Sequence, residues 1–125
     1  MISISSTGSF DQIEKFLQRL AKLDISSIVA REAEKGVAAL SRATPHDSGK
    51  AANSWSYEVT KTASSITIGW MNSDIENGYP VALMIQYGHG TGTGGYIAGI
   101  DYINPAMRPI FDQIAETVWK AVISA

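Results

Sequence analysis

Apolar residues recur at helical spacing near the start of the chain, which predicts a first helix over residues 10–23. The positions that share one helical face are Phe10, Ile13, Phe16, Leu17 and Leu20. Ser9 and Gln12 have the spacing of a capping box, in which each side chain bonds to the backbone amide of the other. Asp11 falls in the first turn, where its negative charge suits the helix dipole.

A second stretch with helical spacing follows Asp24, a residue type that is common at the N-cap. Its apolar face consists of Ile25, Ile28, Val29, Ala33, Val37 and Leu40. We expect a helix over residues 25–41, with Gly36 as a tolerated weak point inside it. Pro45 ends the helix because a proline pushes the residue before it towards extended backbone.

The last helix has the clearest signals at its start. Asn104 is placed to cap it, and Pro105 suits the first helical position. Its apolar stripe is Met107, Ile110, Phe111, Ile114, Val118, Trp119 and Val122. We expect this stripe to be buried, and we assign Trp55, Trp70 and Trp119 to the core because each falls on the apolar side of its element.

In the middle of the chain the apolar period changes from helical spacing to two. Residues 54–60 and 66–71 both alternate, which predicts two strands of a hairpin with a turn at residues 61–64. Residues 72–78 are polar and are expected to form a loop. Residues 80–87 are an apolar run whose periodicity does not decide between strand and helix, although a proline at its start favours a short helix.

This order of elements predicts an α+β domain, in which a small antiparallel sheet is packed by two N-terminal helices and a long C-terminal helix. At 125 residues the chain is expected to form one domain over residues 1–125. Residues 1–8 precede the first helix signal and are expected to be flexible. Residues 88–100 are expected to form a glycine-rich loop.

That loop lies within residues 87–105, which hold six of the eleven glycines of the chain. Glycine has many accessible backbone states, and so long a loop in a small domain usually has a function. Tyrosine rings are common at protein interfaces, and three lie in this stretch. We therefore predict a protein-binding surface made by Tyr87, Gly88, His89, Gly90, Thr91, Gly92, Thr93, Gly94, Gly95, Tyr96 and Tyr102.

Composition excludes several classes of function. The formal net charge is −2 and the basic residues are scattered, which argues against a protein that grips nucleic-acid phosphates. The chain has no cysteine, so it has no thiolate nucleophile and no cysteine metal site. No cofactor or metal is expected. No apolar run approaches the length of a membrane span, and no secretory signal begins the chain, so we expect a soluble protein made in a cytoplasm without a membrane partner.

The chemistry-bearing residues give weak signals. The glycine tract has no Lys followed by Ser or Thr and does not open directly into a helix, so it fits neither phosphate-binding loop pattern. His46 and His89 are the only histidines, and both fall in polar loops where solvated side chains are expected. A small enzyme that uses His89 and Asp101 as an acid/base pair is an alternative. No nucleophile motif stands beside either residue, so we expect no catalytic activity.

Three segments carry a resemblance to a known family. They are residues 44–55 (TPHDSGKAANSW), residues 79–91 (YPVALMIQYGHGT) and residues 104–114 (NPAMRPIFDQI). Together they resemble the head–tail joining proteins of long-tailed phages, also called neck or tail-completion proteins. The matching residues are Thr44, Pro45, Asp47, Ser48, Gly49, Ser54, Trp55, Ala82, Ile85, Tyr87, Gly88, Pro105 and Ala106. Gln86 departs from the pattern, where a Glu is common.

The resemblance implies a structural virion protein that forms a ring, a hexamer or a dodecamer, at the head–tail connector. Its partners would be head-closure or portal-side proteins on one side and tail-tube or tail-terminator proteins on the other. DNA would pass through the ring without specific binding. The protein would be located in the virion, or in a related prophage-derived particle, after assembly in the host cytoplasm. A tail-terminator ring is the alternative within the same class.

Overall fold

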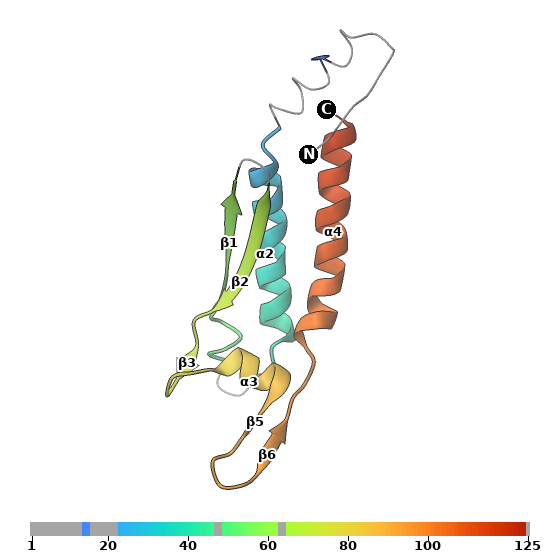
Figure 1. The fold of residues 1–125 in the computed structure, drawn as a ribbon. Coiled ribbons are helices and arrows are strands. Elements are labelled where there is room, and N and C mark those ends of the chain that lie inside the picture. Colours follow the sequence, from blue (N-terminus) through green and yellow to red (C-terminus); the bar gives the residue numbers. More distant parts are fainter. Residues whose placement is uncertain (1–13, 16–22, 47–48, 63–64, 125) are drawn as a thin grey trace.

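The computed structural model describes residues 14–15, 23–46, 49–62 and 65–124. Three long elements lie side by side along one direction, with a cluster of short elements at one end (Figure 1). The long elements are helix α2 (Ile25–Ala43), the hairpin of strands β1 (Trp55–Lys61) and β2 (Ile66–Asn72), and helix α4 (Ile103–Ile123). The short ones are β3 (Ile75–Glu76), β4 (Tyr79–Pro80), α3 (Val81–Tyr87), β5 (Gly88–Gly90) and β6 (Tyr96–Ala98).

The mixed α+β class is confirmed by these elements. Their sheets are three separate two-stranded antiparallel pairs among the described residues, rather than one small sheet. Most of the predicted first helix, residues 10–23, lies outside the described part of the chain. The predicted packing by two N-terminal helices is therefore seen only for α2.

Helix α2 begins and ends where its sequence signals place it. The carboxylate of Asp24 accepts a hydrogen bond from the Ser27 backbone amide at 3.2 Å, which confirms Asp24 as the N-cap. The helix ends at Ala43, two residues beyond the prediction, and Thr44 before Pro45 has extended backbone with ψ of 123°. Its buried face includes Val29, Ala33 and Leu40.

At Gly36 the hairpin packs closely against α2. The indole of Trp70 lies on the helix there, and its Nε1 donates a hydrogen bond to the Ala33 carbonyl at 3.1 Å. A Cβ added at Gly36 would lie 2.6 Å from that Nε1, closer than real Cβ contacts come. The glycine therefore makes room for the indole, and its role is more than that of a tolerated weak point.

Gly36→Ala is expected to lower the free energy of unfolding by about 1 kcal/mol, since overpacking outweighs the gain in helix propensity. Chemical denaturation measures this difference. The matched control is Gly69→Ala, because a Cβ at Gly69 meets no heavy atom within 4 Å. A stabilised Gly36→Ala variant would show that the indole moves aside at no cost.

The predicted hairpin is confirmed, and a second one is added to it. β1 and β2 pair in register from Trp55 with Asn72 to Lys61 with Ile66. Residues 72–78, predicted as a loop, contain β3, which pairs with β4. The turn between them is Asn77–Gly78, with φ of 52° and 81°. Asn-Gly is the preferred sequence for a two-residue hairpin turn, so this signal was present in the chain.

The start and the burial of α4 differ from the prediction. Tyr102 occupies the N-cap position, so Asn104 and Pro105 lie inside the first turn instead of at the cap and the first helical position. Of the apolar stripe, Met107 alone is fully buried within the described structure. Phe111 is 53% exposed and Trp119 is 63% exposed, so the assignment of Trp119 to the core is wrong. The spacing of apolar residues defines a stripe on a helix but does not show that another element covers it.

Candidate interaction surface

The stretch predicted as a glycine-rich loop over residues 88–100 contains two paired strands and forms a hairpin. Gly88 pairs with Ala98, and Gly90 pairs with Tyr96, in antiparallel register. The Thr91 amide donates to the Gly95 carbonyl at 3.0 Å and closes the turn. Gly92 and Gly94 at the tip have φ of 80° and 91°, which side chains rarely adopt.

Glycines at the base of this hairpin allow two backbone segments to touch. A Cβ added at Gly88 would lie 2.6 Å from the Ile97 carbonyl oxygen. A Cβ added at Gly99 would lie 2.6 Å from the Tyr87 carbonyl carbon. The Ile100 amide donates to the Ile85 carbonyl at 2.8 Å beside this contact. These glycines are required by close packing, so the base of the hairpin is fixed to α3.

Gln86 joins the hairpin base to the start of α4, and its side chain is buried. Its Oε1 accepts hydrogen bonds from the backbone amides of Tyr102 at 3.0 Å and Ile103 at 2.9 Å. Its Nε2 donates to Asp101 Oδ1 at 2.7 Å. Sequence reasoning noted Gln86 only as a departure from a family pattern, since nothing in the local sequence shows that residues 86 and 101–103 meet.

Asp101 completes the cap of α4. Its Oδ1 also accepts from the Asn104 side-chain amide at 3.0 Å. The hydrogen bond from Gln86, and after it those from Asn104, lower the pKa of Asp101 below its usual value of 3.8. This carboxylate is therefore held in its charged form by structural partners.

Tyr102 differs from the other residues predicted for the interface. Its ring is buried, and its hydroxyl donates to the Ala82 carbonyl at 2.8 Å. Burial raises the pKa of this hydroxyl above its usual value. Tyr102 therefore packs inside the molecule, which corrects the expectation that its ring faces a partner.

The other two tyrosines predicted for the interface, Tyr87 and Tyr96, lie on a surface that we call the apolar end. It lies at the end of the molecule opposite the C-terminus, on β3–β4, α3 and β5–β6 (Figure 1). Tyr87 is 69% exposed and Tyr96 is 67% exposed, and the Tyr96 hydroxyl donates to the Tyr87 carbonyl at 3.0 Å. The other large exposed apolar residues there are Ile75, Tyr79, Leu83, Ile97 and Ile100. So many exposed apolar side chains on adjoining elements are typical of an interaction surface.

His89 and Asp101 are not joined by any hydrogen bond or ion pair among the described residues. His89 lines a hollow of about 490 Å³ with Tyr79, Met84, Gly90, Thr91 and Gly92, and Asp101 is not part of that lining. The Nδ1 of His89 is buried without a hydrogen-bond partner in the described structure. Asp101 instead bonds with Gln86 and Asn104. This geometry supplies no acid/base pair.

The motif residues of the first family segment fix the path between α2 and β1. Thr44 is buried, its Oγ1 donates to the Leu40 carbonyl at 2.6 Å, and it accepts from Trp55 Nε1 at 2.8 Å. Gly49 has φ of 81°, and Ser54 Oγ donates to the Lys50 carbonyl at 2.6 Å. Pro45 is exposed, and Asp47 and Ser48 lie outside the described residues. The described motif residues thus shape the connector.

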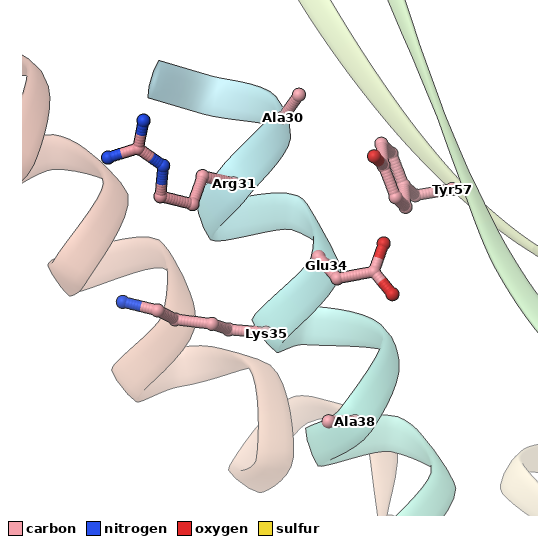
Figure 2. Close-up of a pocket in the computed structure, with 6 residues that line it drawn as sticks. All are labelled: Ala30, Arg31, Glu34, Lys35, Ala38 and Tyr57. Atoms are coloured by element: carbon pink, nitrogen blue, oxygen red, sulfur yellow. The ribbon is translucent and has the colours of Figure 1, made fainter. Parts of the chain in front are cut away.

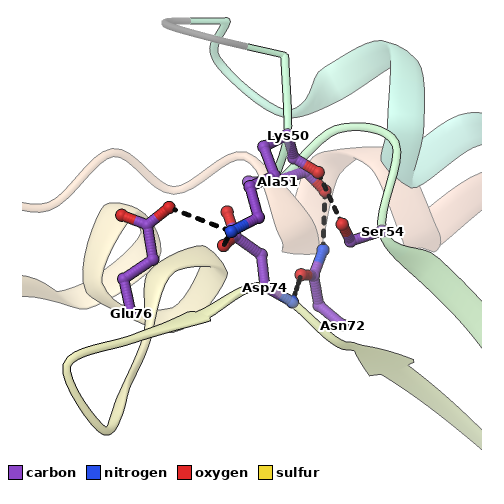
Figure 3. Close-up of polar contacts among 6 residues, drawn as sticks. All are labelled: Lys50, Ala51, Ser54, Asn72, Asp74 and Glu76. Atoms are coloured by element: carbon purple, nitrogen blue, oxygen red, sulfur yellow. Dashed lines mark hydrogen bonds and ion pairs between the residues drawn. The ribbon is translucent and has the colours of Figure 1, made fainter.

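A polar cluster ties this connector to the chain after β2 (Figure 3). Asn72 Nδ2 donates to the Ala51 carbonyl at 2.7 Å, and its Oδ1 accepts from the Asp74 amide at 2.9 Å. Lys50 Nζ lies 3.4 Å from Oδ1 of the buried Asp74 and 3.4 Å from Glu76 Oε1, which are ion-pair distances. These carboxylates, Asp74 first, raise the pKa of Lys50. The cluster has partners for its charges and acts as a structural joint.

Another hollow, of about 540 Å³, lies between α2 and Tyr57 of β1 (Figure 2). Glu34 points towards Tyr57, while Arg31 and Lys35 point to the other side of the helix. Ala30 and Ala38 form the rest of its wall. The hollow is open, and among the described residues no hydrogen bond joins Glu34 to Tyr57.

Within the described ranges, no helix combines the length and apolarity needed to cross a membrane. No cluster of three or more His, Asp or Glu side chains suited to a metal ion occurs in that same part of the chain. Comparison of the chain with protein-family models, with curated proteins and with solved structures gave no match.

Proposed function

We propose that this chain is a non-enzymatic assembly protein that forms a ring at the head–tail connector of a long-tailed phage and joins head to tail. The role is suggested by the resemblance of the three segments described above. The observation that supports it is the apolar end, where exposed tyrosine and isoleucine side chains stand on a hairpin whose base is fixed to α3. A rigid surface of this kind loses little conformational entropy when it binds.

A closed ring requires two different patches on each subunit, because each copy contacts its neighbours head to tail. The apolar end supplies one candidate patch. The hairpin β1–β2 supplies the other, because no further strand pairs with its outer edges among the described residues. A neighbouring copy would add backbone hydrogen bonds along such an edge.

The ring would have six or twelve copies. It would contact head-closure or portal-side proteins on one face and tail-tube or tail-terminator proteins on the other. The net charge of −2 supports a channel through which DNA passes without being held. The proposed location is the virion, with assembly in the host cytoplasm.

The apolar end is tested by Tyr87→Ser combined with Ile97→Thr. Both side chains are more than half exposed, so the subunit is expected to stay folded. The concentration for half-maximal ring assembly should rise at least about tenfold, because exposed aromatic anchors carry much of the binding energy of an interface. Mass photometry and joining of purified heads to tails measure the effect.

The control is Ile123→Thr, which replaces a residue of similar exposure near the opposite end of α4. This variant should assemble and join heads to tails as the unchanged protein does. Normal joining by the Tyr87→Ser, Ile97→Thr variant would refute the role assigned to the apolar end.

A further inference from the structure

The tip of the hairpin β3–β4 places an unbound side-chain amide next to an unbound backbone amide. Asn77 and Gly78 form this turn, and both residues are exposed. Their φ angles of 52° and 81° lie in the left-handed region, which asparagine tolerates and glycine adopts freely. Among the described residues, neither the Asn77 side chain nor the Gly78 backbone amide makes a hydrogen bond. Both groups are therefore free to react with each other.

We propose that Asn77 is a site of spontaneous deamidation. The backbone nitrogen of Gly78 attacks Cγ of Asn77, so that a new C–N bond closes a succinimide ring. The bond from Cγ to the side-chain nitrogen breaks, and this nitrogen leaves as ammonia with the proton of the Gly78 amide. Water then opens the ring at either carbonyl, which gives aspartate or isoaspartate. Water is the only co-reactant.

The surroundings of Gly78 favour this attack. Glycine has no side chain to block the approach of its nitrogen to Cγ of Asn77. A Cβ added at Gly78 would meet no heavy atom within 4 Å, so no other element covers the turn among the described residues. β3 and β4 have two residues each, and so short a hairpin opens easily. Local opening can therefore supply the geometry of attack.

Two other asparagines, Asn53 and Asn72, are followed by an amide that is already bound. The Ser54 amide donates to the Ala51 carbonyl at 3.2 Å, and the Ser73 amide donates to the Ser54 carbonyl at 3.1 Å. The side chain of Asn72 is also held, because its Nδ2 donates to the Ala51 carbonyl at 2.7 Å. Breaking one such hydrogen bond before attack slows the reaction by about fivefold.

The fourth asparagine of the chain, Asn104, is followed by Pro105. A proline nitrogen carries no proton, so it cannot replace the leaving amide in the same way. The Asn104 side chain also donates to Asp101 Oδ1 at 3.0 Å. Asn77 is thus the one asparagine of the four that combines a free side chain with a free amide after it.

Deamidation would change the apolar end in both charge and shape. The new carboxylate stands next to Glu76 in sequence and adds a negative charge to a chain whose net charge is already −2. Isoaspartate has an extra backbone atom, which does not fit the two-residue turn that pairs Glu76 with Tyr79. Tyr79 is one of the exposed rings of the apolar end. An effect on ring assembly rests on the proposed function, whereas the deamidation itself does not.

Peptide mass spectrometry of the full-length protein tests the proposal. The protein is incubated in mildly alkaline buffer, and each asparagine is followed by the mass gained when NH2 is replaced by OH. We expect Asn77 to react at least about tenfold faster than Asn53 or Asn72, because the free amide and the missing Cβ act together. The variant Asn77→Gln should release ammonia at least about fivefold more slowly, since its longer side chain must close a larger ring.

Unfolding separates the structural cause from the preference for a following glycine. In concentrated urea the amides after Asn53 and Asn72 lose their acceptors, so both rates should rise at least about fivefold. The rate at Asn77 should change by less than about threefold, because its neighbouring amide is free in both states. Equal rates at the three sites in the folded protein would overturn the proposal. So would protection of Asn77 by folding that is as strong as the protection of Asn72, or unchanged ammonia release in Asn77→Gln.

Discussion

Replacing Gln86 with leucine is expected to lower the free energy of unfolding by about 3 kcal/mol, since the change leaves two backbone amides without an acceptor. These amides belong to Tyr102 and Ile103, at the start of α4. A helix start has no acceptors of its own for its first amides. Denaturation by urea, followed by circular dichroism, measures the loss.

The control for this substitution is Gln113→Leu in the same helix. Gln113 is exposed and donates one side-chain hydrogen bond, to Thr117 at 3.2 Å. Its replacement should change the free energy of unfolding by less than about 0.5 kcal/mol. Equal losses for the two leucine variants would contradict the role given to Gln86.

Gln86→Glu separates the charge from the shape of this contact. The new carboxylate can still accept from the two amides, but it replaces the amide that donates to Asp101. Two carboxylates would then meet, and the variant should be less stable at neutral pH. Adding Asp101→Asn to this variant should restore stability, because the asparagine side-chain amide at position 101 can donate to the new carboxylate at position 86.

The pH dependence of the two proteins should have opposite sign. In the unchanged protein the pKa of Asp101 is lowered below 3.8, so its contribution is complete above that value and is lost as the pH falls through the lowered pKa. In the Gln86→Glu variant, acidification puts a proton between the two carboxylates and relieves their repulsion. The stability difference between the two proteins should therefore shrink as the pH falls towards about 4.

Gly99→Ala is expected to cost about 3 kcal/mol of unfolding free energy, at the upper end for overpacking. The added methyl group would overlap the backbone of Gln86, Tyr87 and Gly88, and backbone atoms cannot rotate away as a side chain can. The change should also shift the paired hairpin against α3. Amide hydrogen exchange at Gly88 and Ile100, with urea denaturation, measures both effects.

Gly90→Ala is the matched control in the same hairpin. Its added Cβ would meet only the Gly95 carbonyl oxygen, at 3.8 Å, which is an ordinary contact. This variant should keep its stability within about 0.5 kcal/mol. If both alanine variants behaved alike, the glycines would act through backbone freedom, as a pliable loop would, and the close packing at Gly99 would be unimportant.

Local signals predicted the long elements well. Asp24 starts α2 and Pro45 stops it, because capping and proline geometry act within a few residues. The alternation around Trp55 and Trp70 predicted the hairpin for a similar reason. Long-range contacts were not predictable in this way. Gln86 meets residues 15 to 17 positions away, and no local rule connects them.

That the candidate surface binds a partner stays a prediction, and the backbone form of this stretch was not predicted from the sequence. The tyrosines and glycines of residues 87–96 indicated an exposed surface, and Tyr87 and Tyr96 are exposed. The glycines were interpreted as a source of backbone flexibility, whereas Gly88 and Gly99 allow close contact between two backbone segments. Composition alone does not separate these two uses of glycine. Similarly, the position of Trp119 on an apolar stripe did not reveal that α4 leaves it exposed.

The hydrogen bond between Trp55 and Thr44 has a consequence for how this chain tolerates change. It holds the two ends of the connector at residues 45–54 together, at 2.8 Å between side-chain atoms. A segment with fixed ends behaves as a closed loop. The entropic cost of closing such a loop grows only slowly with its length, by about 0.6 kcal/mol per doubling. Insertions near residues 46–48 would therefore lengthen the loop while α2 and β1 keep their places. New recognition sequences can be added there with little loss of stability.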